Sequence, residues 1–457
     1  MPKHVYFIGI GGSSMSGIAE LVRSSGCKVS GSDRAQSSKT KKLIASGVTI
    51  YPVHSSENIS DDIDLVVYSA AIASDNPELV EARRRGIPTI ERGEYLGQLA
   101  KKHPYTVAVS GTHGKTTTTS MISSIMISAD QEPCIHIGGV LDRIHNNVLP
   151  SDGDYFVTEA CEFSGSFLHF YPYAAVVTNI EEDHLDYYKT FDNLVAAFGK
   201  FVSQCREDGF VVVCGHDEYM PVITAQAKCR VLTYGTDSSF DYCATNINVG
   251  KDKTSFTVCK KETGESFDVE ISVPGSFNVL NSLAACAVCY ELGCSPEAIR
   301  DGLSQYTGTK RRFECVGYVN GAPLIDDYAH HPTELKVTLE IAKSKRQEGG
   351  KIYAVFQPVT FSRALAFFDV FPEVLKDADV IIITDIYAAR EIDKHEITGK
   401  QISDYCVQKG LDSRNIGPFP DIARYLEERV TNKDMIVLLS CGDLDKLADE
   451  FKDLSKI

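Results

Sequence analysis

No apolar run of 18 or more residues occurs in the chain, so the sequence predicts no membrane-spanning helix. The first apolar stretch, in "MPKHVYFIGIGG", ends in glycines without a small-residue cleavage site, and we interpret it as a β-strand and not as a signal peptide. Basic residues are not in excess, since the formal net charge is -16, which argues against a nucleic-acid-binding surface. The 14 cysteines lack framework spacing and fit a reducing compartment. We therefore expect a cytoplasmic protein, monomer or dimer, without membrane insertion.

One group of cysteines could suggest a metal site. Cys286, Cys289 and Cys294 lie in "NSLAACAVCYELGC", which contains a C-x-x-C pair. A structural zinc site requires four ligands, usually with a second pair at short spacing. Leu and Ala recur around these cysteines at helical period, so a buried helix explains them better.

The length of 457 residues and the order of elements predict three α/β domains in series. Residues 1–100 alternate strands and helices as a Rossmann-like domain, with "DLVVYSAAI" as its third strand. Residues 101–310 are predicted to form a P-loop-type mononucleotide-binding domain, with a small antiparallel β element around Gly264. Residues 311–457 are predicted to form a second Rossmann-like domain.

The strongest local signal is "VAVSGTHGKTTT", in which a strand runs into a glycine loop and then a helix. Such a loop points backbone N–H groups and the helix N-terminus at phosphates. We expect Lys115 to reach the terminal phosphates and the Thr116 hydroxyl to ligate Mg²⁺. The strict motif requires glycine where Val109 stands, so the flanking strand and helix carry this prediction.

Two further strands of this domain end in polar groups. "YFVTEACEF" and "AAVVTNIEEDHLDYY" deliver Glu159, Glu162, Asn179, Asp183, His184 and Asp186. Ligand sites of open α/β sheets gather outside the carboxyl ends of the strands. A carboxylate and an imidazole at that edge could hold Mg²⁺, although the ion prefers oxygen ligands, and each residue alone could equally be a solvated loop residue or a helix cap.

The first glycine turn, "GIGGSSMSG", is a partial dinucleotide fingerprint. Gly9 and Gly11 fit G-x-G-x-x-G, Ser14 occupies the last glycine position, and Asp33 stands where a ribose contact would be. An NAD dehydrogenase would leave the second phosphate loop unexplained. We therefore predict that the turn approaches the pyrophosphate of another nucleotide.

Charged residues gather again near residue 311. "GTKRRFE" places Arg311 and Arg312 beside the predicted domain boundary, and "LIDDYAHHPTE" brings Asp326, Asp327, His330 and His331. Paired arginines are usually a solvated or salt-bridged surface, but one of them could neutralise a transferring phosphoryl group.

Taken together, these motifs resemble the Mur ligase family over nearly the full length of the chain. The matching segments, in order, are "FIGIGGSSMSGIAE", "GTHGKTTT", "TNIEEDHLDYY", "PGSFNVLNSLAA", "KRRFE", "DDYAHHPTE" and "DIYAARE". The resemblance is to the branch that joins L-alanine to the lactyl carboxylate of UDP-N-acetylmuramate in peptidoglycan synthesis. It implies ATP and Mg²⁺ as cofactors, an acyl-phosphate intermediate, and three substrates, namely UDP-N-acetylmuramate, L-alanine and ATP.

The resemblance also implies a role for each matching position. It implies Lys115, Glu159, His184, Arg312 and Asp327 as catalytic residues, and Thr116, Glu159 and His184 as metal ligands. It implies that ATP is bound by Gly111, Thr112, His113, Gly114, Lys115, Thr116, Thr117, Asn278, Asn281, Arg312 and Asp327. It implies that the UDP-sugar is bound by Gly9, Gly11, Gly12, Ser13, Ser14, Asp33, Ser69 and His184. The amino acid and the acceptor carboxylate are expected near His330 and Arg363.

The chain departs from this branch at three places. Val359 and Phe277 each stand where a histidine is usual, and "SCGDL" replaces a small-residue glycine motif. Three alternatives therefore stay open: a sister ligase that recycles murein peptide, a folylpolyglutamate synthase, and a nucleotide-binding homologue without catalysis. The glycine turn argues against the folylpolyglutamate synthase, because those enzymes lack the N-terminal sugar-nucleotide domain.

Overall fold

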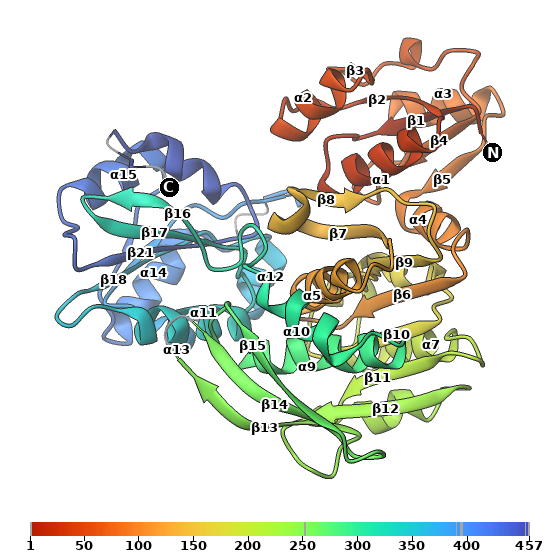
Figure 1. Ribbon diagram of the computed structural model, residues 1–457. Helices are drawn as coiled ribbons and strands as arrows, with labels where there is room; N and C mark the ends of the chain where they lie inside the picture. Colours follow the sequence, from red (N-terminus) through yellow and green to blue (C-terminus); the bar gives the residue numbers. More distant parts are fainter. Residues whose placement is uncertain (1, 251–252, 390, 394–395, 453, 456–457) are drawn as a thin grey trace. The chain divides into compact units, whose positions relative to one another are not determined.

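The structure is a computed structural model that describes residues 2–250, 253–389, 391–393, 396–452 and 454–455. The chain divides into two compact units, Met1–Thr309 and Lys310–Ile457. The first unit contains two sheets and the second contains one, so three sheets follow one another along the sequence (Figure 1). The predicted α/β class with three sheets in series is confirmed. No helix in the described ranges is both long and apolar enough to cross a membrane.

The first sheet is five-stranded and parallel, in the order β3-β2-β1-β4-β5. Its strands are β1 (His4–Ile8), β2 (Lys28–Ser32), β3 (Thr49–Tyr51), β4 (Leu65–Tyr68) and β5 (Thr89–Glu91). Its helices are α1 (Ser13–Ser24), α2 (Ser38–Ala45), η1 (Ser56–Asn58), α3 (Pro77–Arg84) and α4 (Arg92–Ala100).

Strand β1 is buried on both faces. Val5 and Phe7 pack in the core that contains α1 and α4, and Tyr6 and Ile8 pack in the core that contains α3. The order of the strands reverses between β1 and β4, so the loop after β1 opens at a topological switch point, where α/β sheets bind ligands.

The sequence interpretation of this sheet was wrong in one respect. "DLVVYSAAI" forms β4, the fourth strand, because Thr49–Tyr51 forms a strand before it. Strands β3 and β5 contain only three residues each and form the two edges of the sheet. A run of three residues is too short to show the alternation by which strands are predicted from sequence.

The second sheet is ten-stranded, in the order β15-β14-β13-β12-β11-β10-β6-β9-β7-β8. Its strands are β6 (Tyr105–Ser110), β7 (Cys134–Leu141), β8 (Asn146–Leu149), β9 (Tyr155–Glu159), β10 (Ala174–Val177), β11 (Phe210–Cys214), β12 (Arg230–Gly235), β13 (Tyr242–Val249), β14 (Thr254–Lys260) and β15 (Ser266–Ile271). Its helices are α5 (Lys115–Ser128), η2 (Asp142–Ile144), η3 (Phe163–His169), α6 (Leu185–Tyr188), α7 (Phe191–Ser203), α8 (Met220–Thr224), α9 (Phe277–Glu291) and α10 (Pro296–Ser304).

Strand β6 lies in the interior of this sheet, between β10 and β9, and is parallel to both. Val107 and Val109 face the core formed with α5 and α9, whereas Ala108 faces the core that includes α7. The predicted antiparallel element is present as β14 and β15, which continue the same sheet beyond β13. Cys286 and Cys289 are buried within α9, as the interpretation of that segment as a buried helix predicts.

The second unit contains a six-stranded sheet in the order β16-β17-β21-β18-β19-β20. Its elements are β16 (Glu314–Val319), β17 (Ala322–Asp327), α11 (Pro332–Lys345), β18 (Ile352–Phe356), α12 (Phe361–Ala366), α13 (Phe371–Leu375), β19 (Val380–Ile383), α14 (Gly399–Gln408), β20 (Ser413–Asn415), α15 (Phe419–Glu427), β21 (Met435–Leu439) and η4 (Leu444–Glu450). Only the pair β16–β17 is antiparallel among the pairings described. The motif segment "DIYAARE" follows β19, and its residue 390 lies outside the described residues.

Candidate active site

Two glycines of the loop between β6 and α5 let neighbouring residues pack closely against its backbone. Gly111 has φ +132°, and a side chain there would lie 2.0 Å from Thr178 Oγ1. Gly114 has φ +81° and ends the loop without a side chain to cap α5. The first turn of α5 also contains no acidic residue. The first N–H groups of the helix are therefore available to an anion, and the helix dipole favours negative charge there.

Lys115 folds back over this loop. Its Nζ donates to the carbonyls of Gly111 (2.5 Å) and Thr112 (2.9 Å) and lies 3.0 Å from Glu162 Oε2. Burial by itself would lower the pKa of Lys115, but its acidic neighbours, Glu162 first among them, together outweigh burial and raise that pKa above its ordinary value. Lys115 is therefore a fixed positive charge at the base of the loop.

The strand beside β6 holds the loop in shape. The Asn179 side chain accepts a hydrogen bond from His113 N (2.8 Å) and donates one to His113 O (3.0 Å). Thr178 Oγ1 also donates to His113 O (2.5 Å). Asn179, a sequence candidate for ligand binding, thus contacts the loop backbone and fixes its conformation.

The structure separates the roles of the two acidic residues after β9. Glu159 Oε1 accepts a hydrogen bond from Gly138 N (2.6 Å), although its charge still acts on Lys115. Glu162, only 2% exposed, contacts both Lys115 and His184, whose Nε2 lies 3.6 Å from Glu162 Oε1. Both oxygens of Glu162 face Lys115 Nζ: Oε1 accepts its hydrogen bond (3.1 Å), and Oε2 lies 3.0 Å from it. The carboxylate in contact with the His184 imidazole is therefore Glu162, one of the two acidic candidates of the sequence, whereas the family resemblance implied Glu159.

The predicted pair Asn278 and Asn281 lies on α9, beside Gly114. Asn281 Oδ1 would be 2.4 Å from a side chain at Gly114, and Asn281 Nδ2 donates to Asn278 Oδ1 (3.0 Å). Thr118 Oγ1, on α5, donates to Asn281 (3.4 Å). Thr116 and Thr117 lie in the first turn of α5 and are nearly buried. Helix α9 thus contacts the end of the phosphate loop and the start of α5 through Asn281.

The glycine turn of the first sheet forms a second anion-binding geometry. Gly9 N and Ile10 N donate to Ser32 O (2.8 and 3.0 Å), and Gly12 precedes α1 without a capping side chain. No acidic residue lies in the first turn of α1, which begins at Ser13 and Ser14. This arrangement matches that of the loop at α5.

Asp33 and Ser69, which are predicted to bind the UDP-sugar, make hydrogen bonds within the protein. The Asp33 carboxylate accepts hydrogen bonds from Gly11 N (2.8 Å) and Ala35 N (2.9 Å), so it fixes the turn itself. Ser69 lies in the loop after β4, and its carbonyl accepts from Ile72 N (2.9 Å). A side chain at Gly9 would contact Ile72, which places this loop beside the turn.

The second unit gathers its predicted residues at the carboxyl end of β17. Arg311 donates to Ser440 O (2.7 Å) and lies 3.2 Å from Asp326, so its guanidinium is used within the unit. Arg312 lies over the Tyr328 ring (5.2 Å) and remains 31% exposed. Asp327 accepts hydrogen bonds from Phe313 N and Ala329 N, and burial raises the pKa of its carboxyl to about 6 although Arg312 opposes the shift.

The remaining predicted residues of this unit lie on neighbouring segments. His330 Nδ1 is 3.3 Å from Glu334 Oε2, and Arg363 lies on α12. Val359 is buried and its backbone forms a β-bridge with Tyr387, so a buried apolar side chain occupies the position where a histidine is usual. Phe277, the departure in the first unit, begins α9 and its ring occupies the space beside Gly275.

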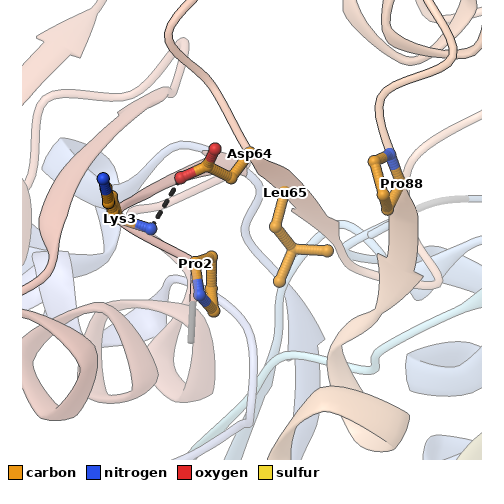
Figure 2. A pocket seen from close by; sticks show the side chains of 5 residues that line it. All are labelled: Pro2, Lys3, Asp64, Leu65 and Pro88. Carbon is orange, nitrogen blue, oxygen red and sulfur yellow. Dashed lines mark hydrogen bonds between the residues drawn. The ribbon is translucent and has the colours of Figure 1, made fainter.

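A shallow hollow elsewhere in the first sheet does not contain these residues. Figure 2 shows it between Pro2, Lys3, Asp64, Leu65 and Pro88, with Lys3 N donating to Asp64 (2.6 Å). These residues lie at the amino ends of β1, β4 and β5, whereas the glycine turn follows the carboxyl end of β1. Parallel sheets bind ligands at their carboxyl ends, so we assign this hollow no role in the site.

Two glycine turns, each following a parallel strand and preceding a helix, one of them with a lysine–carboxylate pair, are typical of nucleotide-dependent α/β enzymes. The chain belongs to the Mur ligase family: residues 4–104 match "Mur ligase family, catalytic domain", residues 109–289 match "Mur ligase middle domain", and residues 311–442 match "Mur ligase, glutamate ligase domain". The family resemblance drawn from the sequence is confirmed.

Individual relatives cover nearly the whole chain. UDP-N-acetylmuramate–L-alanine ligase of Acetivibrio thermocellus is 46% identical over 98% of this chain and 95% of its own length. The enzyme of the same name from Clostridium acetobutylicum is 44% identical over 98% of this chain and 97% of its own length. Among solved structures, UDP-N-acetylmuramate-alanine ligase of Thermotoga maritima has a TM-score of 0.84 at 28% identity, with 98% of each chain covered. A murein peptide ligase of Psychrobacter arcticus has a TM-score of 0.76 at 26% identity, with 97% of each chain covered.

Proposed function

We propose that this protein joins L-alanine to UDP-N-acetylmuramate and converts ATP to ADP and phosphate in the reaction, as a step in peptidoglycan precursor synthesis in the cytoplasm. The observation that carries the proposal is the contact between Lys115 and Glu162 at the loop before α5, in a chain 46% identical to a ligase of that name. The glycine turn before α1 supports a second nucleotide, the sugar nucleotide, in the same unit.

The chemistry requires activation of a carboxylate, which is a poor electrophile at neutral pH. An oxygen of the lactyl carboxylate attacks the γ-phosphorus of ATP, the bond to the β–γ bridging oxygen breaks, and ADP leaves. The amine of L-alanine then attacks the acyl carbon, loses a proton, and expels phosphate. Lys115, held against the loop carbonyls, places its charge where the transferring phosphoryl group gains negative charge.

The donors at this site fit Mg²⁺, which prefers oxygen ligands. We assign the ion to the Thr116 hydroxyl and the Glu162 carboxylate, with Glu159 and His184 beside them. The position of the buried Glu162 carboxylate, between Lys115 and His184, supports this assignment. When bound, the ion would neutralise phosphate charge.

We extend the proposal to the other predicted residues. Gly9, Gly11, Gly12, Ser13 and Ser14 bind the pyrophosphate of the UDP-sugar through the N-terminus of α1. Arg312 and Asp327 act on ATP, and His330 and Arg363 recognise the amino acid or the acceptor carboxylate. The three predicted domains, residues 1–100, 101–310 and 311–457, would then bind the sugar nucleotide, ATP and the amino acid.

The test is phosphate release from ATP by the purified protein. We expect release only when UDP-N-acetylmuramate and L-alanine are both present, and loss of release in Lys115→Ala. Lys101→Ala, which changes an exposed lysine on the same unit, is the matched control and should keep the wild-type rate. Phosphate release that is indifferent to the sugar nucleotide would refute the proposal.

A panel of amine donors separates the close alternatives. Glycine and L-serine differ little from L-alanine in size, and a site of this kind discriminates a methylene by about 10- to 200-fold. The tripeptide L-alanyl-γ-D-glutamyl-meso-diaminopimelate tests the murein peptide ligase alternative. Turnover with the tripeptide but not with L-alanine would favour that sister activity.

A further inference from the structure

Arg92, which no sequence motif singled out, connects two segments of the first unit. It is the first residue of α4, and its side chain is 17% exposed. Nη1 donates to Ser14 Oγ (3.2 Å) and Nη2 donates to Ser166 Oγ (3.2 Å). One guanidinium thus joins α1 to η3, which are about 150 residues apart in the sequence.

The two serines belong to the two nucleotide sites. Ser14 lies in the first turn of α1, directly after the glycine turn. Ser166 lies in η3, which begins directly after Glu162, and Gly165 N donates to Glu162 O (2.9 Å). Glu162 in turn contacts Lys115. Arg92 therefore lies between the predicted pyrophosphate turn and the acidic partner of the phosphate-loop lysine.

The packing around Arg92 leaves these segments little freedom to shift. Helix α4 lies so close to η3 that a side chain at Gly97 would be 2.5 Å from His169 O. On the other side α1 packs against β7 and β8 (Figure 1). Ser14 Oγ also lies 3.1 Å from His136 Nε2, and His136 Nδ1 lies 3.3 Å from Thr158 Oγ1, next to Glu159.

The hydrogen bonds of Arg92 go to neutral groups. The acidic oxygen nearest to it among the described residues is Glu91 Oε1, 3.9 Å from Nε, and the other Glu91 oxygen caps α4 by accepting from Gly93 N (2.6 Å). A partly buried arginine that binds two hydroxyl groups gains less than one in a close ion pair. Its planar fork does fix the two hydroxyls relative to each other, which a lysine could not do.

We propose that Arg92 is a positioning residue that fixes the position of the sugar-nucleotide turn relative to the Glu162–Lys115 pair. The inference rests on the proposed function, because the lactyl carboxylate carried by the sugar nucleotide must reach the γ-phosphate of ATP. A misplacement of about 1 Å in such a reaction costs about 100-fold in rate. Arg92 acts on the reaction through Ser14 and Ser166 and does not itself contact the reacting atoms.

The test is a double-mutant cycle on Ser14→Ala and Ser166→Ala, measured as kcat/KM for UDP-N-acetylmuramate at saturating ATP and L-alanine. Among the described residues, Arg92 is the group whose hydrogen bonds join the two serines. We expect the double variant to lose at least about threefold less than the product of the single losses, which is the signature of coupled sites. In an Arg92→Met background the same two effects should multiply. If, in the wild-type background, the loss in the double serine variant equals the product of the two single losses, the inference is overturned.

Variants of Arg92 itself separate positioning from stability. Arg92→Met should lower kcat/KM for the sugar nucleotide by about 10- to 100-fold while KM for ATP stays within about twofold. Arg92→Lys keeps the charge but loses the planar guanidinium that donates to both serines, so its kcat/KM should fall as in Arg92→Met. Arg85→Met, which removes a surface arginine paired with Glu81 and Asp61, is the matched control. A parallel fall in thermal midpoint and in affinity for both nucleotides would instead mean a structural role and overturn the inference.

Failure of the proposed function gives a different result. If the wild-type protein releases no phosphate with the sugar nucleotide and L-alanine, the activity itself is wrong. If the wild type is active but the cycle is multiplicative, only the role of Arg92 is wrong. Should Arg92→Met fail to fold, the serine cycle in the wild-type background still decides the question.

Discussion

Glu162 and Glu159 stand three residues apart after the same strand, yet they meet different partners. Glu159 is the last residue of β9 and accepts from the backbone of Gly138, whereas Glu162 follows a turn and reaches Lys115 and His184. The difference arises because the chain leaves the sheet between them. A carboxylate in the strand remains beside the neighbouring strand β7, and one beyond it can turn toward the phosphate loop.

We therefore predict that Glu162→Gln costs more activity than Glu159→Gln. The amide keeps the shape but removes the charge that holds Lys115, so kcat should fall by about 100-fold or more, as for loss of a group that stabilises developing charge. Glu159→Gln should cost clearly less, because that oxygen is occupied by Gly138 N. Phosphate release measures both, with thermal midpoints as the control for folding. A larger loss in Glu159→Gln would restore the assignment made from the sequence.

A second prediction at this scale concerns His136. Burial, reinforced by the neighbouring Arg92, lowers the pKa of His136 to about 4 in the folded protein. Above a pH of about 6.5 the imidazole is neutral in both the folded and the unfolded protein. As the pH falls toward 4, the unfolded chain binds the proton first, so the free energy of unfolding falls by about 3 kcal/mol in all. His136→Gln should remove this component. Urea unfolding of both proteins between pH 7 and pH 4 measures it, and equal slopes with pH would contradict the assignment.

At the scale of elements, the loop before α5 depends on Gly114, and replacing it has two separable costs in free energy. An alanine at position 114 would adopt φ +81° and place its Cβ 2.4 Å from Asn281 Oδ1. The first cost is backbone strain of about 1 kcal/mol, and the second is displacement of α9 or of the loop.

We expect Gly114→Ala to lower kcat/KM for ATP by about 100-fold, because the loop must move away from the position that Lys115 requires. Gly264→Ala is the matched control: Gly264 has φ +71° in the β14–β15 hairpin and no atom within 4 Å of an added side chain. It should lower stability through strain alone and leave the kinetics unchanged. Equal kinetic losses in the two variants would mean that the contact with Asn281 has no role.

The elements also show which features the sequence predicts. Strands whose residues are almost all buried, such as β6, β10 and β21, and the glycine loops that follow β1 and β6 were predicted because both signals are local. The three-residue strands β3 and β5 were not, since their pairing depends on β2 and β4. The bridge from Ser14 through Arg92 to Ser166 was also missed, because a serine or an arginine carries no pattern that identifies a partner more than 70 residues away.

At the scale of the whole molecule, each unit has its own hydrophobic cores. The cores of the second unit draw only on its own residues, such as Leu335 and Ile436, and those of the first unit do the same. Units with separate cores can unfold separately.

Calorimetry should therefore record an unfolding profile that does not fit one two-state transition. ATP should raise the transition of the first unit, which carries the phosphate loop, by mass action. Leu335 is fully buried in the second unit, and Leu335→Ala should lower that unit's free energy of unfolding by the 2–5 kcal/mol typical of such a cavity. One transition should therefore move down by several degrees, while the ATP-sensitive transition stays in place. A single transition that moves as a whole in both experiments would show that the units unfold together.

The strand order of the ten-stranded sheet has a consequence during protein synthesis. Strand β6 ends at Ser110, but the strands on either side of it, β9 and β10, begin only at Tyr155 and Ala174. At about 5–20 residues per second, the phosphate loop leaves the ribosome several seconds before the strands that shape it exist. The first sheet, complete by Glu91, can fold during that interval. The nascent chain can therefore form the glycine turn before α1 earlier than the loop before α5.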